Sequence, residues 1–91
     1  MTALPLPAKL DLAQAATLAK AIRAESGSDL ALDASGVTLL GGLGLQILAS
    51  AAQSWRASGH RLTISPRSEA FDEALAIFGV DLATLQSEEA A

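Results

Sequence analysis

The chain has 91 residues, of which 51% are hydrophobic, and ten acidic against six basic side chains give a net charge of −4 at pH 7. This length accommodates one domain, and the scattered basic residues exclude the clustered Lys and Arg of a nucleic-acid surface.

Cysteine is absent, which excludes disulfides and is typical of a reducing compartment. The first residues lack the charged and apolar regions of a secretory signal. The longest apolar run, Val37 to Ala49, is too short to cross a membrane. We therefore expect a cytoplasmic protein without membrane insertion.

The first 27 residues predict an extended segment followed by a helix. Residues 1–8 alternate leucine with proline, and because proline cannot donate to a β-ladder, we expect an edge strand or an extended lead-in there. Asp11 is a predicted N-cap, with Gln14 three residues later. Gly27 is expected to end the helix. Its apolar stripe consists of Ala15, Leu18, Ala19 and Ile22.

The stretch from Leu30 to Trp55 is the centre of the predicted fold. Apolar residues alternate from Leu30 to Ala34, with the two-residue period of a strand. Asp33 and Ser35 flank the end of this strand and are placed to cap backbone amides of the turn. Three glycines then supply a backbone that is free to adopt positive φ or to pack closely. They are Gly41, Gly42 and Gly44. The spacing of the next apolar residues predicts a helix. Its core stripe is Gly44, Ile47, Leu48, Ala51 and Trp55.

The remaining residues predict one more strand and a third helix. Ser58-Gly59-His60 ends the second helix, and Arg61 to Ser65 reads as a short strand that Pro66 ends. Ser68 is the predicted N-cap of the third helix, which Gly79 closes. The expected buried face of this helix consists of Phe71, Ala74, Leu75 and Phe78. A last turn or short strand is expected at Val80, Leu82 and Leu85, and residues 86–91 are expected to be a frayed acidic tail.

Strands that alternate with helices predict parallel pairing through right-handed crossovers. The fold class is therefore α/β, with a small open and mostly parallel sheet covered by helices. We divide the chain into a lead-in or edge strand at residues 1–8, a domain at residues 9–86 and an acidic tail at residues 87–91.

Catalytic and cofactor motifs are not found. His60 is the single histidine, it has no G-x-S-x-G partner motif, and a solvent-exposed turn residue is the plain interpretation. Gly42-x-Gly44 begins a dinucleotide fingerprint that lacks its third glycine, and Leu45-Gln46 stands where a P-loop needs lysine and serine or threonine. The sequence predicts no enzyme activity, no cofactor and no metal site.

The start of the second helix has an unusual surface. At 100° per residue, small and amide side chains lie opposite the core stripe, and Leu43 lies beside them. These are Gly42, Gln46, Ala49, Ser50 and Gln53. An ordinary solvated face with one exposed leucine is the plain interpretation. The alternative is a flat, uncharged docking surface for another protein.

The run Asp33 to Leu45 resembles the signature of STAS domains, the anti-sigma-factor antagonist family. That signature is a strand that ends in Asp-x-Ser-x-Val and a turn of the type Asp-Ser-Ser-Gly-Leu that opens a helix. The positions that match are Asp33, Ser35, Val37, Gly44 and Leu45. Further similarities, at Gly59, Ser65-Pro66, Phe71, Leu75 and Phe78-Gly79, extend the resemblance over nearly all of the chain after residue 8.

Two departures accompany the resemblance. Where phosphorylation-controlled members have Asp and the phosphorylated Ser, this chain has Gly41 and Gly42, neither of which can accept a phosphate. The family's N-terminal β-hairpin is also reduced to the proline-containing lead-in. Modification of Ser35 or Thr38 stays open.

The resemblance implies a non-catalytic signalling module that binds a protein partner. The most similar members are short stand-alone proteins found beside bacterial chemotaxis genes, which implies a histidine-kinase-like partner. The alternatives are the STAS subunit of a lipid-transport ABC complex, which docks on an ATPase, and a non-phosphorylatable anti-sigma-factor antagonist. We expect the partner surface to include Gly41, Gly42, Leu43, Gln46 and Ser50, with Asp33, Ser35 and Gly44 supporting the turn. A homodimer through an exposed sheet edge is a further possibility.

Overall fold

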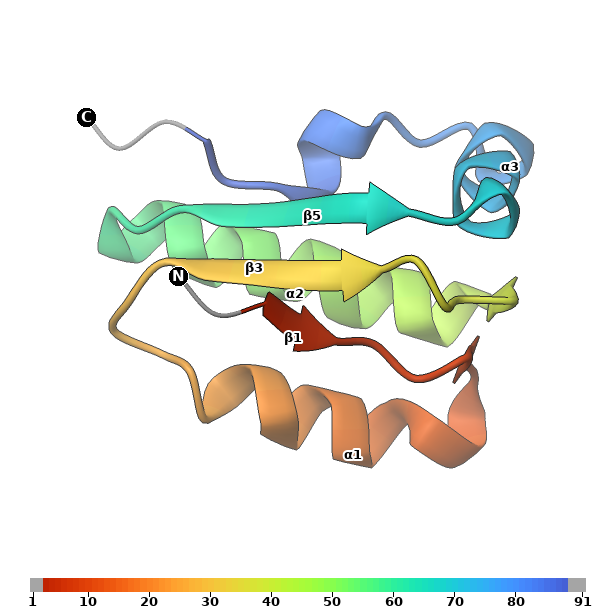
Figure 1. Cartoon of the computed structure of the whole chain (residues 1–91). Helices are drawn as coiled ribbons and strands as arrows, with labels where there is room; N and C mark the ends of the chain where they lie inside the picture. The colour runs from red at the N-terminus through yellow and green to blue at the C-terminus, as the bar shows by residue number, and fades with distance from the viewer. Residues whose placement is uncertain (1–2, 89–91) are drawn as a thin grey trace.

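The computed structural model describes residues 3–88, and three parallel strands in the order β1-β3-β5 form its main sheet (Figure 1). Right-handed crossovers through helices join strands of this kind, so the predicted α/β class with an open parallel sheet is confirmed. The strands are β1 (Ala3–Pro5), β3 (Leu30–Ala34) and β5 (Leu62–Arg67). The sequence analysis predicted β1 as either an edge strand or a lead-in, and the strand order makes it an edge strand.

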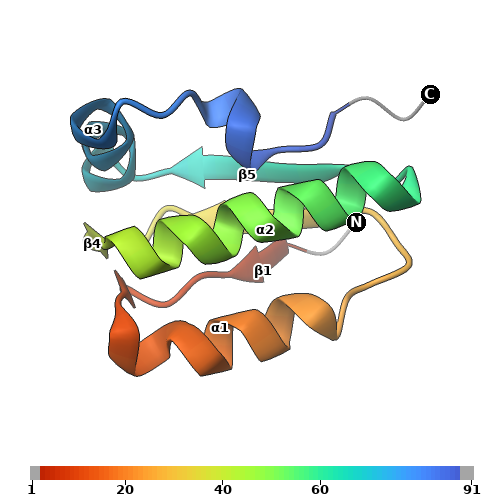
Figure 2. The same cartoon turned by 180° about the vertical axis from the view of Figure 1, so that it is seen from behind.

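Two long helices lie side by side, and the view from behind in Figure 2 shows α2 crossing in front of the sheet with α1 next to it. A third helix, α3, sits at the end of the sheet toward which β3 and β5 point (Figure 1). The helices are α1 (Leu12–Arg23), α2 (Gly42–Ser58), α3 (Glu69–Phe78) and the short 3₁₀ helix η1 (Leu82–Leu85). The alternating burial of β3 follows from this arrangement, because the helices cover the face that carries Leu30, Leu32 and Ala34.

A second, two-stranded parallel sheet was not predicted. It pairs β2 (Lys9–Leu10) with β4 (Leu39–Leu40). The pairing joins the segment before α1 to the segment before α2, and Leu10 is completely buried at the junction. Two-residue strands are too short to show a period of two in the sequence, so pattern analysis had no signal for them.

The predicted helix caps are confirmed at Asp11 and Ser68. The Asp11 carboxylate accepts a hydrogen bond from the Gln14 amide at 3.3 Å, and the Ser68 hydroxyl accepts one from the Phe71 amide at 3.1 Å. The expected end of the first helix at Gly27 is wrong, because α1 ends at Arg23 and its C-cap is Ala24. Further turns carry the chain on to Gly27, which has a φ of 93° and serves the loop rather than the helix.

Phe78 does not belong to the core, which corrects the predicted inner face of α3. Phe71 is completely buried and Leu75 is 5% exposed, whereas the Phe78 side chain is 44% exposed. Phe78 is the last residue of α3, immediately before the left-handed C-cap Gly79. Helical spacing places the three residues on one stripe, but the described chain does not cover the end of that stripe.

Pro66 does not end the last strand, because β5 continues to Arg67. The ladder with β3 is irregular at this point: Ile64 pairs with Leu32, and Arg67 pairs with Ala34. A bulge at a sheet edge is a place where proline is tolerated. The Ser65-Pro66 peptide bond is cis.

The frayed tail expected from residue 86 is wrong at its first two residues. The Ser87 backbone exchanges hydrogen bonds of 2.7 and 2.8 Å with Leu62, and the Gln86 side-chain oxygen accepts the Ile64 amide at 2.8 Å. Both residues are buried because they cover the outer edge of β5. Residues 89–91 of the predicted tail lie outside the described residues.

Among the described residues, the outer edge of β1 is not covered like that of β5, but it has fewer hydrogen-bond donors for a further strand. The Leu6 amide donates to the Asp33 carbonyl at 2.9 Å, so in an alternating strand the amides of the neighbouring odd-numbered positions face outward. Pro5 and Pro7 occupy two of these positions and have no N–H. A homodimer through a sheet edge stays a prediction, and at the β1 edge it would form without these two donors.

Candidate functional site

The start of α2 is held by close backbone packing against Leu10. A Cβ atom added to Gly44 would lie 2.6 Å from the Leu10 carbonyl oxygen and 2.7 Å from the Leu10 Cβ, both closer than real Cβ contacts allow. The Gly41 amide also donates to the Leu10 carbonyl at 3.0 Å. Of the two roles proposed for the glycines, close packing therefore holds for Gly44. Positive φ does not hold for any of the three, because the glycines with positive φ are Gly27, Gly59 and Gly79.

No side chain caps the N-terminus of α2. Its N-cap is Gly41, whose carbonyl accepts the first helical hydrogen bond from the Leu45 amide at 3.0 Å. The first turn contains no acidic residue, although the helix dipole favours one there. An added Cβ on Gly42 would meet nothing within 4 Å. The helix start is thus uncharged and open on the Gly42 side.

Asp33 and Ser35 form a small turn of their own at the end of β3. One Asp33 carboxylate oxygen accepts hydrogen bonds from the Ser35 hydroxyl at 2.7 Å and from the Ser35 amide at 2.9 Å. The hydroxyl first, and then the amide, lower the pKa of Asp33 below its ordinary value. Thr38 donates through its hydroxyl to the Ala8 carbonyl at 3.1 Å. These contacts order the segment before β4, and among residues 3–88 no hydrogen bond joins Asp33 or Ser35 to the glycines.

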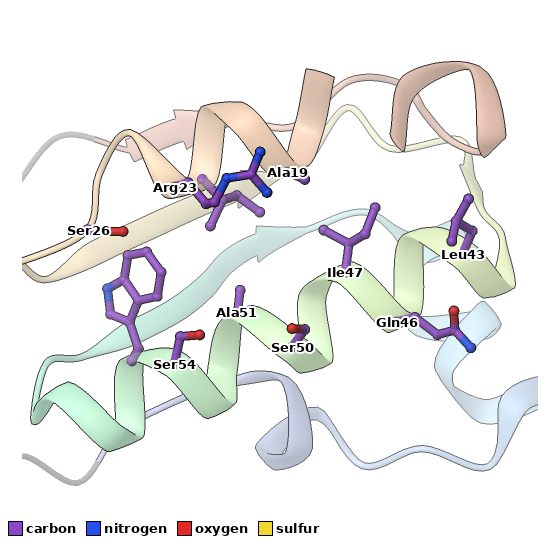
Figure 3. Close-up of a pocket in the computed structure, with 11 residues that line it drawn as sticks. Ala19, Arg23, Ser26, Leu43, Gln46, Ile47, Ser50, Ala51 and Ser54 are labelled. Atoms are coloured by element: carbon purple, nitrogen blue, oxygen red, sulfur yellow. The ribbon is translucent and has the colours of Figure 1, made fainter. Parts of the chain in front are cut away.

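Three of the predicted partner-binding residues line a groove between α1 and α2. Leu43, Gln46 and Ser50 lie along one side of this groove, which has a volume of about 500 Å³ (Figure 3). Leu43 is 38% exposed at one end. Gly41 and Gly42 precede the groove and are not part of its lining. The groove therefore runs along α2 rather than around the turn, and the partner surface stays a prediction.

The opposite side of the groove comes from α1 and the turn that follows it, and it was missed by the sequence analysis. It consists of Ala19, Ile22, Arg23 and Ser26. Helical periodicity assigned Ala19 and Ile22 to the core, and Ile22 is indeed 2% exposed. A groove depends on how closely two helices approach each other, and no pattern within one helix reports that distance.

His60 is half-buried and lies beside Asp29, with 3.6 Å between its Nδ1 and the carboxylate. The same carboxylate oxygen accepts the Arg61 amide at 2.8 Å, so Asp29 helps to order the turn before β5. Within residues 3–88, no group of three or more His, Asp or Glu side chains is arranged to hold a metal ion. The His60–Asp29 pair lies outside the groove.

The parallel sheet, the strand-turn-helix centre and the glycine-based start of α2 define a small STAS-type domain. The chain belongs to the STAS family described as "Mlab, STAS domain", whose sequence model matches residues 2–86. Comparisons with curated proteins and with solved structures gave no match.

Family membership confirms the resemblance at the level of the domain. STAS domains are in general non-catalytic, and the family supports a signalling or regulatory role. Across residues 3–88 none of the helices has the length and apolar character needed to span a bilayer.

Proposed function

We propose that this STAS-domain protein regulates a histidine-kinase-like partner of the chemotaxis type by protein–protein binding, through the surface at the start of α2. We define this docking surface as Gly41, Gly42, Leu43, Gln46 and Ser50. The observation that carries the proposal is the half-exposed Leu43 on a helix start that has no charge and no side-chain cap. A large apolar side chain in an uncharged setting suits the centre of a protein interface, from which charged residues are depleted.

The rigidity of the docking surface supports the same role. Gly44 fixes the helix start against Leu10, and β2 pairs with β4 immediately before it. A surface that is already ordered loses little conformational entropy on binding. Asp33 and Ser35 order the preceding segment through their mutual hydrogen bonds.

The proposed binding is constitutive with respect to the turn. Gly41 and Gly42 have no hydroxyl group, so a kinase cannot switch this surface by phosphorylating those two positions. The protein would act by its presence and concentration, or through a signal received elsewhere on its surface.

A second candidate partner is the ATPase of a lipid-transport ABC complex. The sequence resemblance includes STAS subunits of such complexes, and an uncharged docking surface suits an ATPase as well as a kinase. A non-phosphorylatable anti-sigma-factor antagonist would use the same surface on an anti-sigma kinase.

Titration calorimetry with purified candidates separates these functions. The chemotaxis-type histidine kinase, the lipid-transport ATPase and an anti-sigma kinase from the same genome would each be titrated with the protein. We expect binding to the histidine kinase, and we expect Leu43→Ala to weaken it about tenfold, as a central apolar contact does. Ile77→Ala is the matched control, because Ile77 is 84% exposed on α3 and lies outside the docking surface. Binding to the ATPase alone, or an equal loss of affinity in both variants, would overturn the proposal.

A further inference from the structure

The groove between α1 and α2 is elongated. From Leu43 to Trp55 the helix rises about 18 Å at 1.5 Å per residue, and the groove along it has a volume of about 500 Å³. This volume lies within the range of small-molecule sites, about 300–1,000 Å³. An elongated ligand can therefore lie along α2.

The walls of the groove favour an apolar chain over an extended peptide. The floor carries Ile22, Ile47 and Ala51, together with the Trp55 ring, whose N–H is already donated to the Ser28 carbonyl at 2.9 Å. The backbone groups along α2 are used within the helix itself. The groove therefore offers an extended peptide no backbone ladder to pair with, and an alkyl chain needs none.

The charge of the residues that line the groove indicates an anionic head group for the ligand. Among the described residues, Arg23 is the one charged residue that lines the groove, and Figure 3 shows it away from Leu43 and Gln46. Among residues 3–88 the ion pairs are His60–Asp29 and Arg67–Asp72, so Arg23 has no acidic partner there. The hydroxyls of Ser26 and Ser54 lie at the same end and can donate to an anion.

We propose that this groove binds a single-chain amphipathic anion, with an alkyl chain along α2 and a carboxylate paired with Arg23. A volume within the range of small-molecule sites and an apolar lining with a few polar groups are features of such sites. Leu43, Gln46 and Ser50 belong both to the groove and to the docking surface, so an occupied groove would alter the surface offered to a partner. That regulatory consequence rests on the proposed function, whereas binding of the anion does not.

The test uses the protein alone, labelled with ¹⁵N, and monomeric dodecanoate as the probe. We expect saturable changes in the amide spectrum at residues 19–26 and 43–55. Dodecyltrimethylammonium has the same chain with the opposite charge and should not produce them. Arg23→Gln should weaken dodecanoate binding about tenfold, the lower value of a hydrogen bond to a charged group. Arg61→Gln is the matched control, because Arg61 is an exposed arginine outside the groove.

A second pair of variants tests the location without changing charge. Ser54→Leu fills the groove and should abolish binding, whereas Gln53→Leu places the same side chain on the adjacent exposed position of α2 and should leave binding unchanged. Equal spectral changes with the cationic probe would overturn the proposal, as would changes centred on the exposed Ile77 and Phe78 or full affinity in a folded Ser54→Leu protein. Such results would leave the protein-docking proposal intact, because no partner enters the experiment.

Discussion

The first turns of α2 and α3 are built in opposite ways. The start of α3 is stabilised by its own side chains: Ser68 caps it, and Glu69 and Asp72 place negative charge where the helix dipole favours it. The start of α2 has no side-chain cap and no acidic residue, and it is held instead by the close contact of Gly44 with Leu10. Long-range backbone packing leaves the outer surface of α2 uncharged. Local side-chain stabilisation and an uncharged outer surface are thus alternatives, and the chain has one at each helix start.

The largest effect should come from the buried residue next to the α3 cap. Phe71→Ala should lower the free energy of unfolding by about 3–5 kcal/mol, because Phe71 is completely buried among core residues. Phe78→Ala is the matched control; the side chain is 44% exposed, and we expect a change below about 1 kcal/mol. Urea unfolding of both variants measures the two values. Equal losses would mean that α3 packs along its whole stripe, as the sequence pattern alone suggested.

The corresponding substitution at the start of α2 should lower stability through a close contact with the backbone rather than through a loss of buried surface. Gly44→Ala introduces a Cβ into the Leu10 backbone, and we expect a loss of about 1–3 kcal/mol from overpacking. Gly42→Ala adds the same methyl group where nothing lies within 4 Å, and it should gain about 0.5–1 kcal/mol because alanine is the better helix former. Opposite shifts of the thermal midpoint are expected. A Gly44→Ala protein as stable as the wild type would show that the helix start can move away from Leu10.

The sequence predicted the start of α3 better than the start of α2, because α3 is capped by nearby side chains whereas α2 is held by a residue distant in sequence. The capping roles of Ser68 and Gly79 involve residues only a few positions away, and both residues were read correctly as the cap and the end of α3. The role of Gly44 depends on Leu10, which is distant in sequence and belongs to a two-residue strand. The sequence left positive φ and close packing open as roles for the glycines, and only the three-dimensional structure distinguishes the two.

Some sequence predictions were wrong because they took account of the local pattern of a residue and not of its neighbours in the fold. Phe78 follows the helical period of Phe71, but the described chain leaves it half-exposed. Gln86 and Ser87 look like tail residues, yet they complete the outer edge of β5. The groove was not predicted: the sequence analysis expected a flat surface on α2 and assigned Ile47, Ala51 and Trp55 to the core, and a groove depends on the packing of two helices. Composition and spacing describe one helix or strand at a time, whereas the exposure of a residue, the pairing of an edge and the shape of a groove depend on two elements that pack together.

A smaller effect is expected at the α3 cap itself. Ser68→Ala removes the hydroxyl that accepts the Phe71 amide at 3.1 Å and donates to the Val37 carbonyl at 2.6 Å. We expect a loss of about 1–2 kcal/mol, which is the usual range for a helix cap. Ser54→Ala, at an exposed position inside α2, should change stability by less than about 0.5 kcal/mol. If both serines cost the same in thermal unfolding, side-chain capping would not distinguish the two helix starts.

The smallest effect on stability should come from giving α2 the charge that α3 already has. Gly42→Asp places a carboxylate at the first helical residue, where the dipole should contribute about 0.3–1 kcal/mol at low ionic strength. Gly42 does not have positive φ and has free space around its Cα, so no backbone strain opposes the gain. Because salt screens exposed charges, the gain should diminish at high ionic strength. Thermal unfolding at two salt concentrations measures it.

The same substitution should have a large effect on binding. A carboxylate within the docking surface must lose its water without gaining a counter-ion, which typically costs several kcal/mol, and each 1.4 kcal/mol is about a tenfold loss of affinity. Gly42→Asn is the matched control, since it adds nearly the same volume without charge and should lose much less. A folded, slightly stabilised Gly42→Asp protein that no longer binds its partner would show that α2 lacks an acidic first turn because a partner must approach it. If Gly42→Asp and Gly42→Asn bind as tightly as the wild type, the partner uses another surface and the contrast between the two helix starts concerns stability alone.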